Sequence, residues 1–229
     1  MAIVKSNVIG NLSGRLGNLS ARTVNGKTVL SARPASFNAS NEPIFIVIRS
    51  KFAVTAKFSS KVISLSTLNA IWKKVKHPPH SSFHEVFKVN FPYSSVDRPT
   101  VYNVLTPVSG GFPLPVQSSS VLADNVSVEL LKLSDASVFT PEEVNLSANG
   151  LVCYFSPLNP ADPKFQIITL NDEIPNYVFN QSFESNIALN VIQQNIAAKY
   201  QNSILLFAVA SKNSEGKVIQ YSTTYSKEF

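Results

Sequence analysis

The side chains with the clearest capacity for chemistry in this 229-residue chain are three neighbouring histidines, His77, His80 and His84. His80 and His84 are four residues apart, a spacing that would place both imidazoles on one helix face, as some zinc sites do. A zinc site needs further ligands, and Glu85, the acid nearby, is expected to point away from that face. The sequence therefore favours capping and surface roles for the histidines, and it predicts neither a metal site nor a cofactor.

A second candidate is Gly26-Lys27-Thr28, which matches the end of a phosphate-binding loop. That loop also needs a glycine five positions before Gly26 and a helix after it, but Ala21 stands there and a strand is expected to follow. A β-hairpin is therefore favoured over a nucleotide site.

The acidic pairs and the single cysteine also lack the second residue that catalysis would need. The adjacent acids Glu142-Glu143 and Asp172-Glu173 lie in expected turns, where neighbouring side chains point in different directions and are solvated. General acid–base catalysis instead needs two carboxylates that converge on a cleft. Cys153, the single cysteine, has no identifiable base and is expected to be a small buried hydrophobic residue. No catalytic residue is predicted, and the chain is expected not to be an enzyme.

The first 36 residues differ in composition from the rest of the chain. They hold four of the eight glycines and five basic residues, and no acid occurs before Glu42. The residues concerned are Gly10, Gly14, Gly17 and Gly26, and Lys5, Arg15, Arg22, Lys27 and Arg33. A short, glycine-rich segment cannot bury a core of its own, because ordering glycine costs much backbone entropy. We therefore expect an extended basic arm over residues 1–36 that is stabilised by a neighbouring copy of the chain.

Within this arm, Asn25-Gly26 separates two short alternating runs, 21–24 and 27–30. An Asn-Gly pair in this setting is the strongest short hairpin signal, since both turn positions need positive φ. An isolated two-stranded hairpin is marginal in water. The hairpin is therefore expected to lie on a larger sheet, either its own or that of a partner.

Residues 37–92 are expected to form a compact helical layer. Asn41, Glu42 and Pro43 are typical of a helix start, and apolar residues follow at i, i+4 spacing from Ile44 to Ala56. Further apolar residues between them predict that this helix is buried on more than one side. Two shorter helices are expected over 67–76 and 81–90.

Residues 93–229 read as strands separated by turns, which predicts an immunoglobulin-like β-sandwich and an α+β, mainly β, protein overall. Strands are expected within 100–105, 126–132, 151–155, 165–170, 177–180, 185–190, 203–211 and 217–225. A helix is expected over 191–200, a loop over 109–120 and a hairpin turn over 213–216. Exposed aromatics in this half could stack on sugar rings, and we single out Tyr93, Tyr102 and Phe112 as possible surface-binding residues, although core packing is favoured for most aromatics of these strands.

Charge is divided unevenly along the chain. Its net charge is +6, but residues 1–84 carry 12 basic and one acidic residue, whereas residues 85–229 carry 8 basic and 13 acidic residues. Such a dipolar distribution suits either a polyanion such as nucleic acid or head-to-tail contact between copies. Self-assembly is favoured because the arm lacks the stacking aromatics and arginine clusters of nucleic-acid modules.

The N-terminal motifs resemble those of an uncharacterised bacterial and phage family. The resemblance rests on Gly10-x-x-Ser13-Gly14-x-x-Gly17 and on Asn25-Gly26-Lys27-Thr28-Val29-x-Ser31-x-Arg33-Pro34. It continues with Arg49-x-x-Phe52-Ala53 and a Ser81-Ser82-Phe83 helix that ends at Asn90. The alanine falls early here, and Ile44–Val47 stand where relatives carry a Gln. The resemblance covers residues 1–92, implies a C-terminal immunoglobulin-like sandwich and implies no activity, because the family has none established.

These observations together predict a non-enzymatic structural subunit that self-assembles through its arm into a virion component, such as a capsid or tail, or into an extracellular filament. Its assembly residues are Gly10, Gly14, Arg15, Gly17, Arg22, Asn25, Gly26, Lys27 and Arg33. Its partners would be other copies of itself and other virion or filament proteins. Two alternatives are an adhesin-like carbohydrate- or surface-binding module and a basic nucleic-acid-associated protein. No signal peptide or membrane-inserting segment is expected, so synthesis in the cytoplasm and residence in an assembled particle are predicted.

Overall fold

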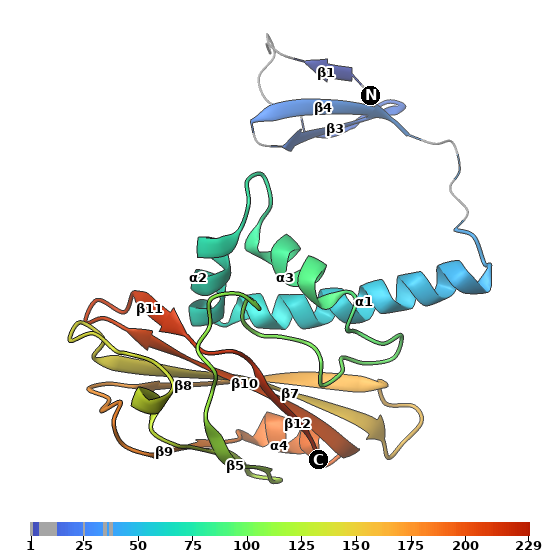
Figure 1. Cartoon of the computed structure of the whole chain (residues 1–229). Helices are drawn as coiled ribbons and strands as arrows, with labels where there is room; N and C mark the ends of the chain where they lie inside the picture. The colour runs from blue at the N-terminus through green and yellow to red at the C-terminus, as the bar shows by residue number, and fades with distance from the viewer. Residues whose placement is uncertain (1, 5–12, 25, 34–35, 37–38) are drawn as a thin grey trace. The chain divides into compact units, whose positions relative to one another are not determined.

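The fold was examined in a computed structural model of the chain (Figure 1). The structure describes residues 2–4, 13–24, 26–33, 36 and 39–229. The chain divides into two compact units, Met1–Phe45 and Ile46–Phe229, which we call the N-terminal unit and the body. Each is described by itself.

The N-terminal unit is a small antiparallel sheet with the strand order β1-β4-β3-β2. Its strands are β1 (Ala2–Val4), β2 (Gly14–Leu16), β3 (Leu19–Val24) and β4 (Lys27–Ala32). Val24 pairs with Lys27 across a two-residue connection, and Gly26 in that connection has φ +75°. The expected hairpin is therefore confirmed, and it lies on a sheet formed by its own chain.

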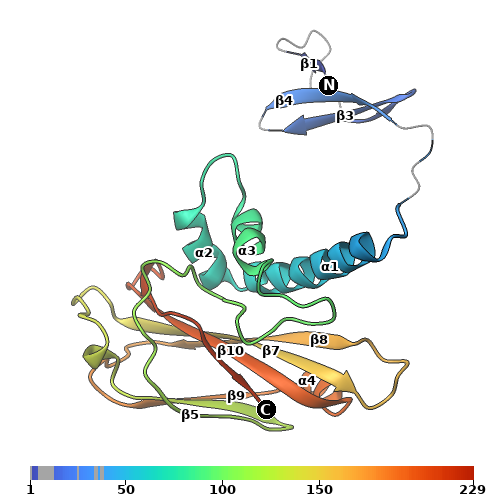
Figure 2. The same cartoon turned by 45° about the vertical axis from the view of Figure 1, so that its right-hand side comes forward.

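The body has three layers, with helices on one face of a five-stranded sheet and a three-stranded sheet on the other (Figures 1 and 2). The helices of the first layer are α1 (Pro43–Ser64), α2 (Ser66–Val75) and α3 (Ser82–Asn90). The central sheet has the order β11-β10-β7-β8, with β12 also paired to β10. Its strands are β7 (Asn145–Pro157), β8 (Phe165–Ile174), β10 (Tyr200–Lys212), β11 (Val218–Tyr221) and β12 (Tyr225–Glu228).

The third layer consists of β5 (Val116–Val121), β6 (Asn125–Leu130) and β9 (Phe183–Ala188) in the order β5-β6-β9. Two short helices accompany it, the 3-10 helix η1 (Leu133–Asp135) and α4 (Val191–Ala197). The chain is thus mainly β with a helical layer, as its sequence predicts, and two of its sheets pack face to face. The immunoglobulin-like topology stays a prediction.

Strands β7 and β10 form the centre of the body because both of their faces are covered. They pair from Tyr200↔Pro157 to Lys212↔Asn145, and nearly all their residues are buried. A strand buried on both faces needs apolar side chains at successive positions rather than at alternate ones, and the run from Ile204 to Ala210 supplies them. Gly150 admits the neighbouring strand closely, since an added Cβ would lie 3.3 Å from the Leu206 carbonyl oxygen.

Two hydrophobic cores result, one on each side of this central pair. The first joins the helices to the sheet and contains Phe58, Ile71 and Trp72 together with Leu151 and Leu206. The second lies between the two sheets, with Val126, Val128 and Leu130 of β6 packed with residues that include Leu146 and Phe207. The helical layer and the two sheets therefore share their cores and form one unit.

Several predictions of local structure are wrong. Residues 100–105 form a turn rather than a strand, because the Asn103 side chain accepts a hydrogen bond from the Thr100 N–H at 2.7 Å. Residues 177–180 are also not a strand, whereas the expected loop 109–120 contains most of β5. Because β5 is rich in serine, its composition does not indicate a strand. The strand forms through its pairing with β6.

Helix α1 differs from its prediction in burial. Its second half is buried through Val54, Phe58 and Val62, but its first half is exposed over residues 44–48 and at Phe52. The periodic apolar pattern predicted a helix correctly. The expectation that this helix is buried on more than one side is wrong for its first three turns.

Candidate functional site

The N-terminal sheet is the first candidate site, because it presents two open edges. Among the described strands, β1 and β2 each pair with one neighbour, and each is three residues long. An edge strand carries a row of backbone N–H and C=O groups that can pair with a strand of another chain. The sheet is therefore built to accept further strands at either side.

Few of the described side chains of this sheet are buried. Among the residues of the N-terminal unit whose burial the structure describes, Ala21 and Thr28 are buried, and Val24 is 47% exposed. Small sheets gain independent stability from a hydrophobic face that packs on something else. The described part of this sheet therefore leaves side chains open to contact.

The predicted basic residues of the arm are exposed and lack acidic partners in the structure as described. Arg15, Arg22, Lys27 and Arg33 all face solvent, and the Arg15 Nε donates a hydrogen bond to the Gly17 carbonyl at 3.4 Å. Within the described residues, every ion pair joins two residues of the body. The sheet therefore offers a positive surface to any partner that covers it.

The structure brings these predicted arm residues together on strands β2 to β4 and their turns. Gly17 and Gly26 have φ of +58° and +75°, conformations that residues with a Cβ rarely adopt, so each is needed to close its hairpin. Gly14, on β2, also has a positive φ. The two remaining members of the predicted set, Gly10 and Asn25, lie outside the described residues.

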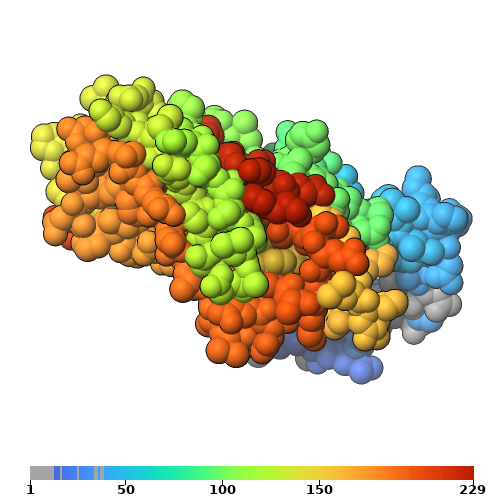
Figure 3. Space-filling model, turned by 90° about the horizontal axis from the view of Figure 1, so that it is seen from below, coloured from blue at the N-terminus to red at the C-terminus, as the bar shows by residue number. Residues whose placement is uncertain are grey.

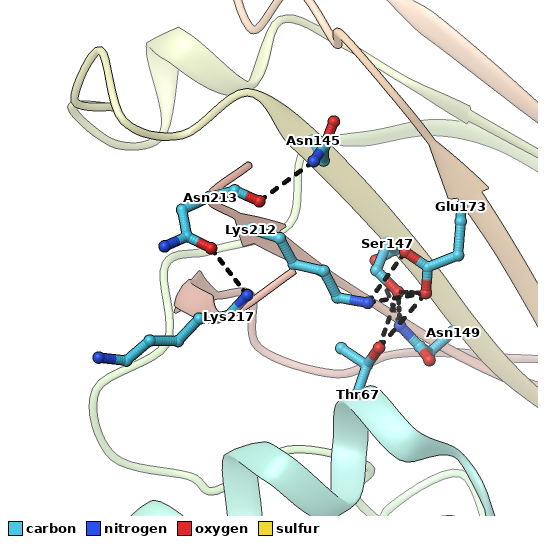
Figure 4. Close-up of polar contacts among 8 residues, drawn as sticks. All are labelled: Thr67, Asn145, Ser147, Asn149, Glu173, Lys212, Asn213 and Lys217. Carbon is cyan, nitrogen blue, oxygen red and sulfur yellow. Dashed lines mark hydrogen bonds and ion pairs between the residues drawn. The ribbon is translucent and has the colours of Figure 1, made fainter. Parts of the chain in front are cut away.

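The second candidate is a polar cluster where α2 meets the central sheet (Figure 4). Ser147 donates to the Glu173 Oε1 at 2.7 Å, and its hydroxyl lies 3.0 Å from that of Thr67 on α2. The Lys212 Nζ donates to both carboxylate oxygens of Glu173, at 2.8 and 2.9 Å. The Asn149 side-chain nitrogen donates to the Ser147 hydroxyl at 3.0 Å. The Glu173 carboxylate thus accepts hydrogen bonds from two strands, β7 and β10, and from helix α2.

This cluster is suited to structure rather than to catalysis. Ser147 is fully buried, so its hydroxyl cannot reach a substrate, and Glu173 is already neutralised by Lys212. A shallow pocket of about 310 Å³ lies beside it, lined by residues that include Asn145, Glu173 and Lys212. The Asn145 side chain donates to the Asn213 carbonyl at 3.1 Å and so ties the β10–β11 turn to β7. The cluster holds α2 and this turn on the sheet.

The solvated turn predicted for Glu142 is confirmed, but the predictions for Glu143 and for Asp172-Glu173 are wrong. Asp172 and Glu173 lie in strand β8 rather than in a turn. Glu143 is 4% exposed, and its carboxylate accepts hydrogen bonds from the Thr140 N–H at 2.8 Å and from the Gln220 Nε2 at 3.1 Å. The Ser211 hydroxyl donates to its other oxygen. Glu143 is therefore a buried structural acceptor, which no local signal in the sequence indicates.

The histidine cluster is also arranged differently from its prediction. His80 precedes α3, and its Nδ1 lies 2.8 Å from the Glu85 Oε1, so the expectation that Glu85 points away is wrong. Ser81 caps α3 by accepting from the His84 N–H at 3.3 Å. The hydrogen bond from His80 is the main reason that the pKa of Glu85 lies below its ordinary value. Among the described residues, no group of three or more His, Cys, Asp or Glu could hold a metal ion.

The predicted surface aromatics separate into two kinds. Tyr93 and Tyr102 are 45% and 71% exposed, but Phe112 is 8% exposed and belongs to the core between the two sheets, so its surface role is wrong. Cys153 is fully buried as predicted, and burial raises the pKa of its thiol to about 12. A thiol with that pKa is not a nucleophile at neutral pH.

Comparisons with known proteins identify no relative of this chain. No family model matches it, and no curated protein matches it. Two solved structures of a β-glucosidase from Kluyveromyces marxianus, one of them with bound glucose, are similar over 62% and 63% of this chain at 14% identity, each with a TM-score of 0.21. The chain spans 17% of the length of either, and such a likeness carries no functional argument. Among the described residues, no helix is long and apolar enough to cross a membrane.

Proposed function

We propose that this chain is a non-enzymatic structural subunit that self-assembles through its N-terminal unit. The observation that carries the proposal is a basic four-stranded sheet with two open edges and two buried residues among those described. Within this proposal the assembly is a virion component or an extracellular filament.

The partner surface is expected on another copy of the chain. Strand addition at an edge gives affinity through backbone hydrogen bonds, whatever the side chains are. Specificity would come from charge, since residues 93–229 contain 12 acidic and 7 basic residues, whereas residues 1–41 contain no acid. The exposed cations of the sheet would meet acidic side chains of the neighbouring subunit.

The edge can be blocked by a single substitution. Hydrogen-bonded pairs alternate along a hairpin from the pair beside its turn. In the β2–β3 hairpin that pair is Leu16↔Leu19, so Arg15 in the next pair is expected to direct its N–H outward. Arg15→Pro removes that donor and should convert assemblies to monomers in sedimentation velocity runs. Arg15→Thr, which keeps the N–H but removes the charge, should assemble with weaker affinity.

A coarser test removes the arm altogether. Deletion of residues 1–30 should leave a body that unfolds with an unchanged midpoint and sediments as a monomer. Assemblies that persist after this deletion, with the same size as those of the full chain, would exclude the proposal. Salt-dependent binding of the full chain to DNA without self-association would support the nucleic-acid alternative instead.

A further inference from the structure

The first turns of α1 form an exposed apolar protrusion on the body. Ile46, Val47 and Ile48 are each between 46% and 48% exposed, and Phe52 one turn later is 55% exposed. Consecutive apolar residues point to every side of a helix, so no single flat contact would cover them. We call Ile46, Val47, Ile48 and Phe52 the α1 protrusion. It requires a concave partner.

The charges around the protrusion exclude a symmetric contact between two protrusions. Arg49 is exposed beside it and forms no ion pair in the described structure. The helical layer over residues 46–92 carries eight basic residues and one acid, Glu85, which bonds to His80. Two such layers facing each other would repel. The partner of the protrusion must therefore be a different, acidic surface.

A concave apolar surface with that character exists elsewhere on the body. Phe139 and Phe179 stack with ring centroids 4.1 Å apart, and the T-shaped contact of Phe139 with the buried Phe112 fixes them on the core. They line a pocket of about 490 Å³ together with Val138, which is 87% exposed, and Val178, which is 51% exposed. We call this the Phe139/Phe179 pocket.

Acidic residues flank this pocket. Asp135 and Glu142 are exposed, directly follow the lining residues Ser134 and Pro141, and form no ion pair among the described residues. Lys132 is the one basic residue between positions 131 and 142. The pocket thus combines apolar walls with net negative charge, which complements the apolar protrusion and its neighbouring Arg49.

The protrusion and the pocket lie toward opposite ends of the body. In Figures 1 and 2 the start of α1 lies at the right, and the short yellow-green helix near residue 135 lies at the left. In Figure 3 the yellow-green and orange segments around residues 135 and 178 lie side by side at the left end. A surface that fits a different surface at the far end of an identical molecule gives a head-to-tail contact, which can repeat without limit unless rotation closes a ring.

We propose that the α1 protrusion of one copy inserts into the Phe139/Phe179 pocket of the next copy. This inference rests on the proposed self-assembly, but it uses residues of the body, whereas the proposed function uses the N-terminal sheet. The two contacts would join the same subunits by independent surfaces. Exposed apolar surface of this kind is otherwise unfavourable in a single subunit.

The test uses full-length chains that carry Arg15→Pro, so that the N-terminal edge contact is removed. It is run at protein concentrations far above those of the sedimentation velocity runs, where these chains are monomers, so that the weaker body contact becomes populated. Added Ile48→Asn or Val138→Asn should each weaken self-association in sedimentation equilibrium by about ten-fold or more. Both positions are exposed, so neither change should move the unfolding midpoint. Leu158→Asn, at an apolar residue that is 60% exposed elsewhere on the body, is the matched control and should change nothing.

Mixtures of a protrusion variant with a pocket variant test directly whether these two surfaces bind each other. An Ile48→Asn chain keeps its pocket and a Val138→Asn chain keeps its protrusion, so an equimolar mixture should form one-to-one dimers that cannot extend. With an added oxidant, Ile48→Cys chains mixed with Val138→Cys chains should form a disulfide that neither chain forms alone. A disulfide in Ile48→Cys chains alone would overturn the proposal in favour of a symmetric helix contact.

Two further outcomes separate this inference from the proposed function. If the Arg15→Pro chain is monomeric up to millimolar concentration, the body contact is refuted while the sheet contact stands. If Arg15→Pro leaves assembly unchanged and Ile48→Asn abolishes it, the sheet contact is refuted and the body contact stands. Binding to phosphatidylserine vesicles that needs Ile48, without self-association, would replace the pocket by a lipid surface and overturn the inference.

Discussion

The N-terminal sheet and the central sheet of the body are both antiparallel, but they differ in what covers them. Strands β7 and β10 are covered on one face by helices and on the other by β6 and its neighbours. Strands β3 and β4 also pair regularly, from Leu19↔Ala32 to Val24↔Lys27, yet Ala21 and Thr28 are the buried residues among those described there. Backbone pairing is thus similar in the two sheets, and side-chain burial is not.

This difference in side-chain burial indicates which region contributes most of the stability of the chain. Net stabilisation by a backbone hydrogen bond is modest, whereas burial of a large apolar side chain contributes about 1.5–3 kcal/mol. The body, which buries most of the described apolar side chains, therefore holds most of the folding free energy. If the N-terminal sheet gains stability by being covered, as the proposed self-assembly requires, its folding and its assembly would occur together.

The largest expected effect comes from a cavity in the core between the two sheets. Phe207 on β10 is fully buried, so Phe207→Ala should lower the free energy of unfolding of the body by about 3–5 kcal/mol. The reactivity of Cys153 with a thiol reagent measures this, because the fully buried thiol reacts when the body opens. The rate of modification should rise steeply in the variant.

The counterpart in the N-terminal sheet is Leu30→Ala. Leu30 on β4 is half-buried, and the sheet belongs to a separate unit, so the reactivity of Cys153 should not change. Equal acceleration of Cys153 modification by both substitutions would show that the two units unfold together, and the comparison would then fail.

A smaller effect is expected from the buried polar groups of the body. Glu143→Ala leaves the Ser211 hydroxyl and the Thr140 N–H without the carboxylate that accepts from them, which should cost about 2–3 kcal/mol in a urea titration. Glu142→Ala, one residue earlier and exposed, is the matched control and should stay within about 0.5 kcal/mol of the unchanged protein. Similar losses from both substitutions would mean that the buried acceptor has no special role.

Local signals explain which parts of the fold were predictable. The start of α1 is marked by Pro43 and the turn of the β3–β4 hairpin by Gly26, and both elements are present. Strand β7 is apolar from Leu151 to Phe155 and β10 from Ile204 to Ala210, which their burial on both faces explains. In each of these cases the residues that define the element are close together in the sequence, so a short window contains the necessary information.

The errors arise where a distant partner decides the outcome. Phe112 lies in a Gly- and Pro-rich segment that was expected to be a loop, but Phe139, far along the chain, covers it. Glu143 reads as a solvated acid until Ser211 and Gln220 are brought to it by β10 and β11. The first turns of α1 read as buried because they are apolar, and the body provides no cover for them. The N-terminal residues proposed for assembly were chosen because the arm is rich in glycine and basic residues. Composition indicates that this surface is positive, but it does not identify what binds there.

The smallest expected effect is a difference in how the stability of the helical layer and that of the N-terminal sheet respond to acid. The hydrogen bond from His80 holds the pKa of Glu85 below its ordinary value of 4.5. A carboxylate with a depressed pKa in the folded state stabilises the protein above the pKa of the unfolded state, and this contribution is lost as pH falls through the lower folded value. The helical layer should therefore loosen below pH 4.5, whereas the N-terminal sheet should not respond, because no acid precedes Glu42.

Fluorescence of Trp72, the single tryptophan, reports on the helical layer because its side chain is buried there and donates to the Leu105 carbonyl at 2.7 Å. Glu85→Gln removes the ionisation, so the difference between the acid titrations of the two proteins isolates this group from the other carboxylates of the body. The stabilisation by Glu85, measured as the difference in stability between the two proteins, should be largest above pH 4.5 and should vanish at more acid values, where both side chains are neutral. A titration that Glu85→Gln leaves unchanged would show that the His80–Glu85 bond adds nothing to the body, and that acid acts through other groups.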